Sequence, residues 1–152
     1  MGKYLHEKEI FRNKKALSCG NEDLEILGIE HTLLNINLPA LMWAEKKEDA
    51  LPFVSRGREY WFDREQVEDI DRQLQYAWGY GIAATAILLN SPQRFGSHEE
   101  EALLKKVIHP DFQWEDKNAF ISAFPMETEE GRNYYRAFVE FLSERYMRDD
   151  GK

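Results

Sequence analysis

Two long and mainly apolar runs stand out in the hydropathy pattern, from Glu30 to Leu38 and from Ile82 to Asn90. Each has the length of a strand, and each carries hydrophobic residues on both alternating faces, which is typical of strands buried in a parallel sheet. A third, shorter apolar run extends from Ala119 to Phe124 and stops at Pro125. We therefore predict three strands that lie far apart in the sequence.

Helical periodicity separates the first two runs. Asp63 is a typical N-cap because Gln66 follows three residues later, and the glycines Gly79 and Gly81 are expected to end the helix. The apolar stripe of this helix consists of Val67, Ile70, Leu74, Ala77 and Trp78. The spacing thus predicts that all five side chains are buried on one face.

Two further helices and a hairpin complete the predicted elements. Ser97 and Glu100 form a capping box for a short helix through Ile108, and Thr128 can cap the last helix. The apolar stripe of that last helix contains Tyr134, Tyr135, Phe138, Phe141, Leu142 and Tyr146. A hairpin is indicated because 51–54 and 59–62 flank a turn that contains Gly57.

Strands that alternate with helices indicate the α/β class, with parallel strands covered by helices. No repeat, linker or low-complexity segment divides the chain, so we treat residues 1–152 as a single domain. A complete (β/α)8 barrel needs roughly 200 residues or more. If the architecture is a barrel, the 152 residues can supply only about its first half.

Composition and charge narrow the function classes. The net charge is −8 and the sequence pI is near 5.1, without a basic stripe that could neutralise phosphates, so nucleic acid and anionic membrane surfaces are not expected as partners. The chain shows neither a signal peptide nor a membrane span, and a cytoplasmic location is the expectation. Cys19 is the single cysteine and is interpreted as having no redox or metal role.

Asparagines occupy the end of both long runs. Because side chains alternate along a strand, His31, Leu33, Asn35 and Asn37 share one face, whereas Thr32, Leu34, Ile36 and Leu38 share the face that would pack on helices. In a parallel barrel the first face points inward, and Asn90 ends the second run at the corresponding place. These amides either cap nearby loop backbone, as asparagine often does, or line a polar binding site.

Three tryptophans outside the helices are candidates for contacts with a sugar ring. Trp43 and Trp61 follow the first predicted strand, and Trp114 follows the second. Aromatic faces bury the apolar side of a sugar while polar groups meet its hydroxyls, although packing of a long loop would equally employ large aromatic residues. His109, which precedes Pro110, is either a site residue or a local hydrogen-bond partner.

Motifs for other chemistries are missing from the sequence. It contains no HExxH, no glycine-rich phosphate loop and no GxSxG elbow, so no metal and no cofactor are expected. Its acidic residues concentrate in helices and at helix starts, where they favour the helix dipole and solubility. No pair of catalytic carboxylates, as glycoside hydrolysis would need, can be assigned.

Several segments in order resemble a known family. They read LGIEHTLLNINL, GREYWF leading into EDIDRQ, GIAATAILLN, and AF followed by EEGRNYYRAFVEFLSERY. This combination, from about Leu27 to Tyr146, is similar to the N-terminal half of a bacterial domain-of-unknown-function family of glycoside-hydrolase-like (β/α)8 barrels, a branch of the (trans)glycosidase superfamily. The resemblance matches His31 and Asn35 to polar residues of the family's first strand, and Asn90 to an asparagine after its second. Pro125 departs from the asparagine expected after Ala123 and Phe124.

The resemblance implies a truncated or split glycoside-hydrolase-like domain that contributes part of a carbohydrate-binding pocket. The family's acid/base glutamate and its nucleophile would belong to strands beyond Lys152, so the chain alone is expected to be inactive. Its expected contacts with carbohydrate are His31, Asn35, Asn37, Asn90, Trp43, Trp61 and Trp114. Its expected partners are carbohydrate and either a second copy or a complementary C-terminal half, because a partial barrel exposes strand edges. The alternative is a non-catalytic small α/β module that binds sugar or protein.

Overall fold

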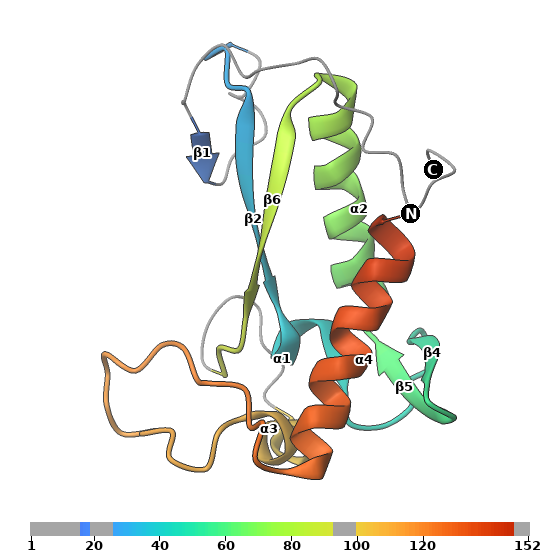
Figure 1. Ribbon diagram of the computed structural model, residues 1–152, viewed down its shortest axis with the longest axis vertical. Coiled ribbons are helices and arrows are strands. Elements are labelled where there is room, and N and C mark those ends of the chain that lie inside the picture. The colour runs from blue at the N-terminus through green and yellow to red at the C-terminus, as the bar shows by residue number, and fades with distance from the viewer. Residues whose placement is uncertain (1–15, 19–25, 93–99, 148–152) are drawn as a thin grey trace.

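A computed structural model describes residues 16–18, 26–92 and 100–147 of the chain. Three parallel strands form the first sheet, in the order β1 (Ala16–Ser18), β2 (His31–Asn37), β6 (Ala83–Leu89). The helix α2 (Arg64–Gly79) lies between β2 and β6 in the sequence and packs beside both strands (Figure 1). The predicted mixed α/β class with a parallel sheet is confirmed, and the described strands do not close into a barrel.

The remaining elements begin near the carboxyl end of these strands, and the last helix runs from there back alongside α2 (Figure 1). They are α1 (Leu38–Leu41), the antiparallel sheet of β3 (Met42–Trp43), β5 (Arg58–Phe62) and β4 (Leu51–Ser55), and the helices α3 (Glu101–Val107) and α4 (Glu129–Tyr146). In β2, Thr32, Leu34 and Ile36 are buried, as predicted for the helix-facing side. Leu34 and Ile36 join one hydrophobic core with side chains of α1, α2, α4 and the hairpin.

The predicted helix caps of the long helices are confirmed. Asp63 accepts a hydrogen bond from the backbone N–H of Gln66 at 2.9 Å, and Thr128 accepts one from Gly131 at 3.0 Å. The hairpin turn is also confirmed, because Arg56 and Gly57 both have positive φ angles, 49° and 80°, as a tight hairpin turn requires. Cys19 and Ser97 lie outside the described residues.

The prediction for Trp78 is wrong. Its side chain is 66% exposed, whereas Val67, Ile70 and Ala77 of the same helix are buried. Successive residues of a helix are about 100° apart around its axis. Trp78 therefore points away from the buried side of α2, on which Ala77 lies. The stripe on α2 is therefore narrower than the hydropathy pattern suggests.

The third apolar run does not form a strand. Its backbone meets the end of β6 through one hydrogen bond, from Ser122 N to Asn90 O at 2.8 Å. Side chains bind other backbone groups of the run, since Ser91 Oγ donates to Phe120 O and Asn90 Nδ2 donates to Ala123 O. A carbonyl group that accepts a side-chain donor is not engaged in a backbone ladder, which explains why the run lies beside β6 without extending the sheet.

Gly131 sits where the first turn of α4 crosses Pro125. A Cβ at this position would overlap the carbonyl oxygen and ring of Pro125 and would lie 2.8 Å from Thr128 Oγ1. Although alanine favours helices over glycine, we expect Gly131→Ala to lower the free energy of unfolding by about 2 kcal/mol because the contact is overpacked. Urea denaturation of Gly79→Ala, whose Cβ meets nothing within 4 Å, provides the control and should change stability by less than about 1 kcal/mol. A stable Gly131→Ala protein would contradict this close packing.

A charged cluster joins α2 to the end of α4. Arg145 donates to both carboxylate oxygens of Asp71, and the Tyr146 hydroxyl donates to Asp71 Oδ1 at 2.9 Å. The Arg145 guanidinium, aided by Tyr146, holds the pKa of the Asp71 carboxyl below its usual range. The ionised carboxylate therefore stabilises the fold at neutral pH.

The sign of this pH dependence is testable. A depressed pKa in the folded state stabilises the fold above the unfolded value of about 3.9, and that stabilisation is lost as the pH falls through the folded pKa. We expect Asp71→Asn to cost about 1 kcal/mol at pH 7, with the difference from wild type shrinking below about pH 4. Asp69→Asn, which removes an exposed pair with Arg72, should cost less than about 0.5 kcal/mol at any pH. A difference that persists unchanged at pH 2 would contradict the assignment.

Candidate functional site

The side chain of Asn37 links the ends of the two long strands. Its Nδ2 donates to Ser91 O at 3.0 Å, and its Oδ1 accepts from Ser91 N at 2.8 Å. Both halves of this buried amide therefore bind the backbone that follows β6. Of the two roles considered for Asn37, the structure supports the capping of loop backbone.

Asn90 has a similar role at the end of β6. Its side chain is fully buried, and Nδ2 donates to Val107 O at 2.6 Å and to Ala123 O at 3.1 Å. The amide thereby holds the end of α3 and the third apolar run against the end of β6. Its Oδ1 has no hydrogen-bond partner among the described residues.

His31 and Asn35 remain on the outward face of the parallel sheet. His31 Nε2 lies 2.7 Å from the Thr85 hydroxyl of β6, and Asn35 is exposed. The hollow beside Asn35 measures only about 50 Å³ and is shared with Gln66, Asp69 and Gln73. Because small-molecule pockets are roughly 300 Å³ or larger, this hollow is too small for a sugar ring.

A row of ring-bearing side chains crosses the antiparallel sheet. Trp43 of β3 pairs with Trp61 of β5, and Trp61 pairs with Pro52 of β4. Residues directly opposite in a sheet project from the same face, so the three side chains form one row, which we call the Trp platform. The two tryptophans are half-buried and Pro52 is exposed, so the platform is open to solvent.

Packing on the other face of the sheet holds the platform in place. Phe62 stacks on Phe141 of α4 at a centroid distance of 3.8 Å, and Tyr60 meets Tyr134 edge-on at 5.2 Å. Arg58 donates to both carboxylate oxygens of Glu130 at 2.6 and 2.7 Å, which lowers the pKa of that carboxyl. A surface anchored on a helix in this way is pre-organised for binding.

Two lysines lie over the platform rings. Lys46 Nζ is 5.3 Å from the centroid of Trp61, and Lys47 Nζ is 5.1 Å from that of Trp43. Lys47 also forms an ion pair with Glu100 at 2.9 Å. Exposed cation–π contacts are worth about 0.5–1 kcal/mol each, so a ligand that stacks on the rings can displace these lysines at modest cost.

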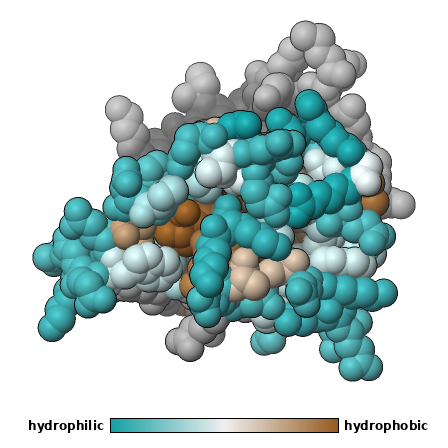
Figure 2. Space-filling view, turned by 90° about the horizontal axis from the view of Figure 1, so that it is seen from below, coloured by the Kyte–Doolittle hydropathy of each residue, from teal (hydrophilic) through white to brown (hydrophobic). Residues whose placement is uncertain are grey.

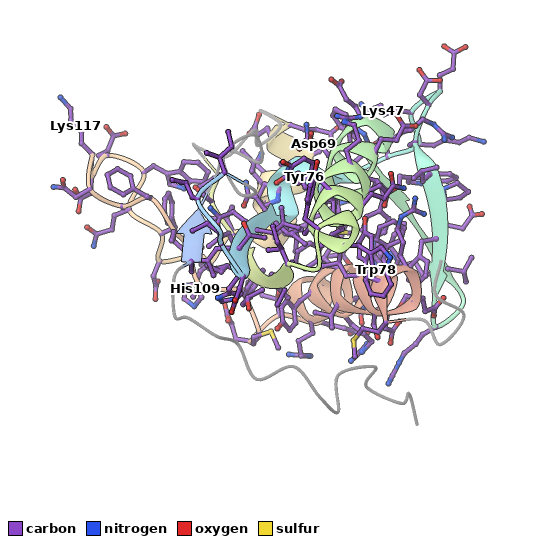
Figure 3. All side chains as sticks on the ribbon, turned by 90° about the horizontal axis from the view of Figure 1, so that it is seen from above. Lys47, Asp69, Tyr76, Trp78, His109 and Lys117 are labelled. Carbon is purple, nitrogen blue, oxygen red and sulfur yellow. The ribbon has the colours of Figure 1, made fainter. Side chains whose placement is uncertain are left out.

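The third candidate tryptophan lies elsewhere. Trp114 is 47% exposed and meets Phe112 edge-on at 5.0 Å, in the long loop between α3 and α4. This loop projects from the opposite side of the molecule to the antiparallel sheet (Figure 1). Figure 3 agrees, since Lys117 of the loop and Lys47 beside the platform lie far apart. The structure therefore brings Trp43 and Trp61 together but separates Trp114 from them.

Sequence reasoning missed Pro52 and the two lysines. Strict alternation in the predicted hairpin strands places Pro52 and Trp61 on the faces opposite Phe53 and Phe62. This alternation could have predicted that Pro52 and Trp61 lie on the open face of the hairpin. The two-residue strand β3, which aligns Trp43 with Trp61, has too few residues to show any periodicity.

Metal and membrane sites find no support in the part of the chain that the structure describes. No group of three or more His, Cys, Asp and Glu side chains there is arranged to hold a metal ion. None of the helices in the same residues has the length and apolar character needed to cross a membrane. The face at the carboxyl end of the parallel strands is mostly hydrophilic, with a small apolar area near its centre (Figure 2).

Comparison with known proteins gives a family without an assigned role. A family model described as Family of unknown function (DUF5722) matches residues 9–152. No curated protein and no solved structure matches the chain.

Proposed function

Because the chain belongs to the DUF5722 family, whose function is unknown, we propose from its own surface that it binds carbohydrate through the Trp platform. One observation carries the proposal: Trp43, Trp61 and Pro52 project in register from the open face of a sheet that is anchored on α4. Tryptophan offers a large, rigid apolar face and a polar N–H at its edge, which suits a ligand with apolar faces and hydroxyl edges.

The dimensions of the platform favour a chain of sugars. Neighbouring strands are about 4.8 Å apart, so a row across three strands spans roughly 10 Å. A row of that length accommodates more than one pyranose ring. The two lysine ammonium groups, once displaced from the rings, remain within reach to donate hydrogen bonds to hydroxyl oxygens.

The net charge of the chain favours neutral sugars over acidic ones. The residues that flank the platform in sequence carry charges of both signs, namely Glu45, Glu48, Asp49, Glu59 and Asp63 against Lys46, Lys47, Arg56, Arg58 and Arg64. The chain as a whole has a net charge of −8, and this net charge repels a carboxylated or sulfated glycan. The proposed ligand class is therefore a neutral oligosaccharide or polysaccharide.

We further propose that the domain is part of a glycoside-hydrolase-like barrel. Parallel sheets in α/β proteins are usually covered on both faces. Here Asn35, Thr85 and Ile87 are exposed on one face of the β2–β6 pair, and Ala84 and Ala86 of β6 are exposed on the face that carries Leu34, so the described helices leave much of β6 uncovered. Parallel strands that are left partly uncovered are what an incomplete barrel would present.

The partner expected for such a partial barrel stays a prediction. Within the described part of the chain, β6 pairs only with β2, and its exposed side chains include Ile87. Strand edges of this kind associate with further strands. Sedimentation over a range of concentrations tests this: self-association supports it, and a monomer at every concentration counts against a second copy as the partner.

Affinity electrophoresis tests the binding proposal. The native protein is run through gels that contain hydroxyethyl cellulose, galactomannan, xylan, a β-1,3-glucan or starch. We expect retardation by at least one of these neutral polysaccharides, and little by an acidic one such as alginate. Free migration in every gel would reject the Trp platform as a carbohydrate-binding surface.

A further inference from the structure

A second hollow lies inside the long loop between α3 and α4. It measures about 300 Å³, and its lining includes His109, Asp111, Phe112, Gln113 and Asp116. The loop runs below the carboxyl ends of β2 and β6 (Figure 1). Ligands of α/β proteins bind outside the carboxyl ends of parallel strands, so the hollow is at the end of the sheet where a binding site is expected.

Hydrogen bonds hold the loop in one shape. His109 N donates to Ser122 Oγ at 3.0 Å, which ties the two ends of the loop together. Phe112 N donates to His109 O at 3.0 Å, and Ala119 N donates to Asp116 O at 3.0 Å. A surface loop whose ends are joined and whose interior is made of turns is a scaffold that frequently carries function.

The polar groups in the hollow are oriented by this scaffold. The Asp111 backbone N–H donates to His109 Nδ1 at 3.2 Å, so the neutral imidazole carries its proton on Nε2. Nε2 lies 3.5 Å from Glu127 Oε1. Asp116 Oδ1 accepts from Asn118 N at 2.8 Å, which fixes that carboxylate and leaves Oδ2 as an acceptor. The ring of Phe112, held edge-on by Trp114, supplies an apolar wall.

We propose that this hollow binds a single neutral sugar ring, as a second site separate from the Trp platform. Its ligand class rests on the proposed carbohydrate-binding function. A volume near 300 Å³ is at the lower end of the range for small-molecule sites and fits one ring. Carboxylate and amide oxygens accept from sugar hydroxyls, the amide N–H groups of Gln113 donate, and Phe112 covers a face of the ring.

The charge of the hollow sets its selectivity. Asp111 and Asp116 line the hollow, Glu127 lies 3.5 Å from His109, and the cation of the same loop, Lys117, points outward from its tip (Figure 3). An acidic sugar would meet like charge at short range, which disfavours it. The site is therefore expected to take neutral hexoses and to reject uronic acids.

Nuclear magnetic resonance of the full chain labelled with ¹⁵N tests the proposal. D-Glucose, D-galactose, D-mannose, D-glucuronate and D-glucosamine are titrated separately. At least one neutral hexose should shift the Trp114 indole and the Gln113 side-chain amide saturably, with a dissociation constant on the order of millimolar, as expected of a small polar ligand. D-Glucuronate should leave both signals in place. Shifts caused only by glucosamine would mean an ammonium site and would overturn the proposal, as would no shift with any sugar.

Variants locate the effect and separate this site from the platform. Gln113→Ala is expected to weaken hexose binding at least threefold, whereas Lys117→Ala on the same loop should leave it unchanged. Equal weakening of hexose binding by both variants, or unchanged binding in both, would overturn the assignment.

If hexoses shift Trp114 although no polysaccharide retards the protein, the platform proposal fails and the hollow stands. If a polysaccharide retards the protein but no hexose shifts Trp114, the hollow proposal fails and the platform stands.

Discussion

Replacing Asn90 with alanine is expected to lower the free energy of unfolding by about 3 kcal/mol, because the buried carbonyl of Val107 loses its donor and a cavity remains. The amide of Asn90 donates to Val107 O at 2.6 Å and to Ala123 O at 3.1 Å from a fully buried position. Asn90→Asp should be worse than Asn90→Ala, since it removes the same donors and places a carboxylate against carbonyl oxygens. Urea denaturation measures both variants.

Asn35→Ala is the matched control for this experiment. Asn35 belongs to the adjacent strand β2 but is exposed, so its replacement should change stability by less than about 0.5 kcal/mol. If Asn90→Ala were as stable as wild type, the amide would not be a structural tie. It would then return to the candidates for ligand binding.

Removal of a platform ring is expected to abolish most carbohydrate affinity. A central aromatic residue of a binding surface typically contributes about 2 kcal/mol or more, which corresponds to roughly thirtyfold in the dissociation constant. Trp61→Ala should have the larger effect, because Trp61 lies between Trp43 and Pro52 in the row. Trp43→Ala should weaken binding about tenfold, since a terminal ring meets less of the ligand.

Trp78→Ala is the control for the platform variants. Trp78 is an exposed tryptophan on α2, outside the antiparallel sheet. Its replacement should leave retardation by the polysaccharide unchanged. Thermal unfolding of all three variants checks that each is folded. Equal loss of binding in Trp78→Ala and Trp61→Ala would show that the contact is non-specific.

The sequence correctly predicts those features of the fold that depend only on residues close together in the chain. The alternation along β2 correctly separates the buried face with Leu34 from the outward face with Asn35, because side chains on a strand alternate whatever surrounds it. The caps at Asp63 and Thr128 are likewise local, since each involves a backbone N–H only three residues away. These features need no knowledge of the rest of the fold.

Features that depend on contacts between distant segments could not be predicted in this way. Asn35 and Asn37 share a face, yet only Asn37 is tied to Ser91, because the register of β2 against β6 places the two backbones together at that point. The exposure of Trp78 similarly depends on which part of α2 the other elements cover. No periodicity in a single strand or helix contains that information.

The set of candidate site residues also changed because of contacts between distant segments. Asn37 and Asn90, expected as sugar contacts, have amide groups that bind backbone atoms, so the proposal no longer rests on them. Trp43 and Trp61 were expected from their residue type alone, and the antiparallel register brings them side by side. Trp114 was expected for the same reason but lies in the loop between α3 and α4, where it contacts Phe112.

The four tryptophans allow the central claim to be measured in one experiment. Each indole N–H gives its own signal in a ¹H–¹⁵N spectrum, and variants assign them. Titration with a soluble oligosaccharide of whichever polysaccharide retards the protein should shift the signals of Trp43 and Trp61 together and leave that of Trp78 in place. Shifts confined to Trp78, or the absence of shifts at Trp43 and Trp61 while the oligosaccharide binds, would contradict a carbohydrate-binding Trp platform.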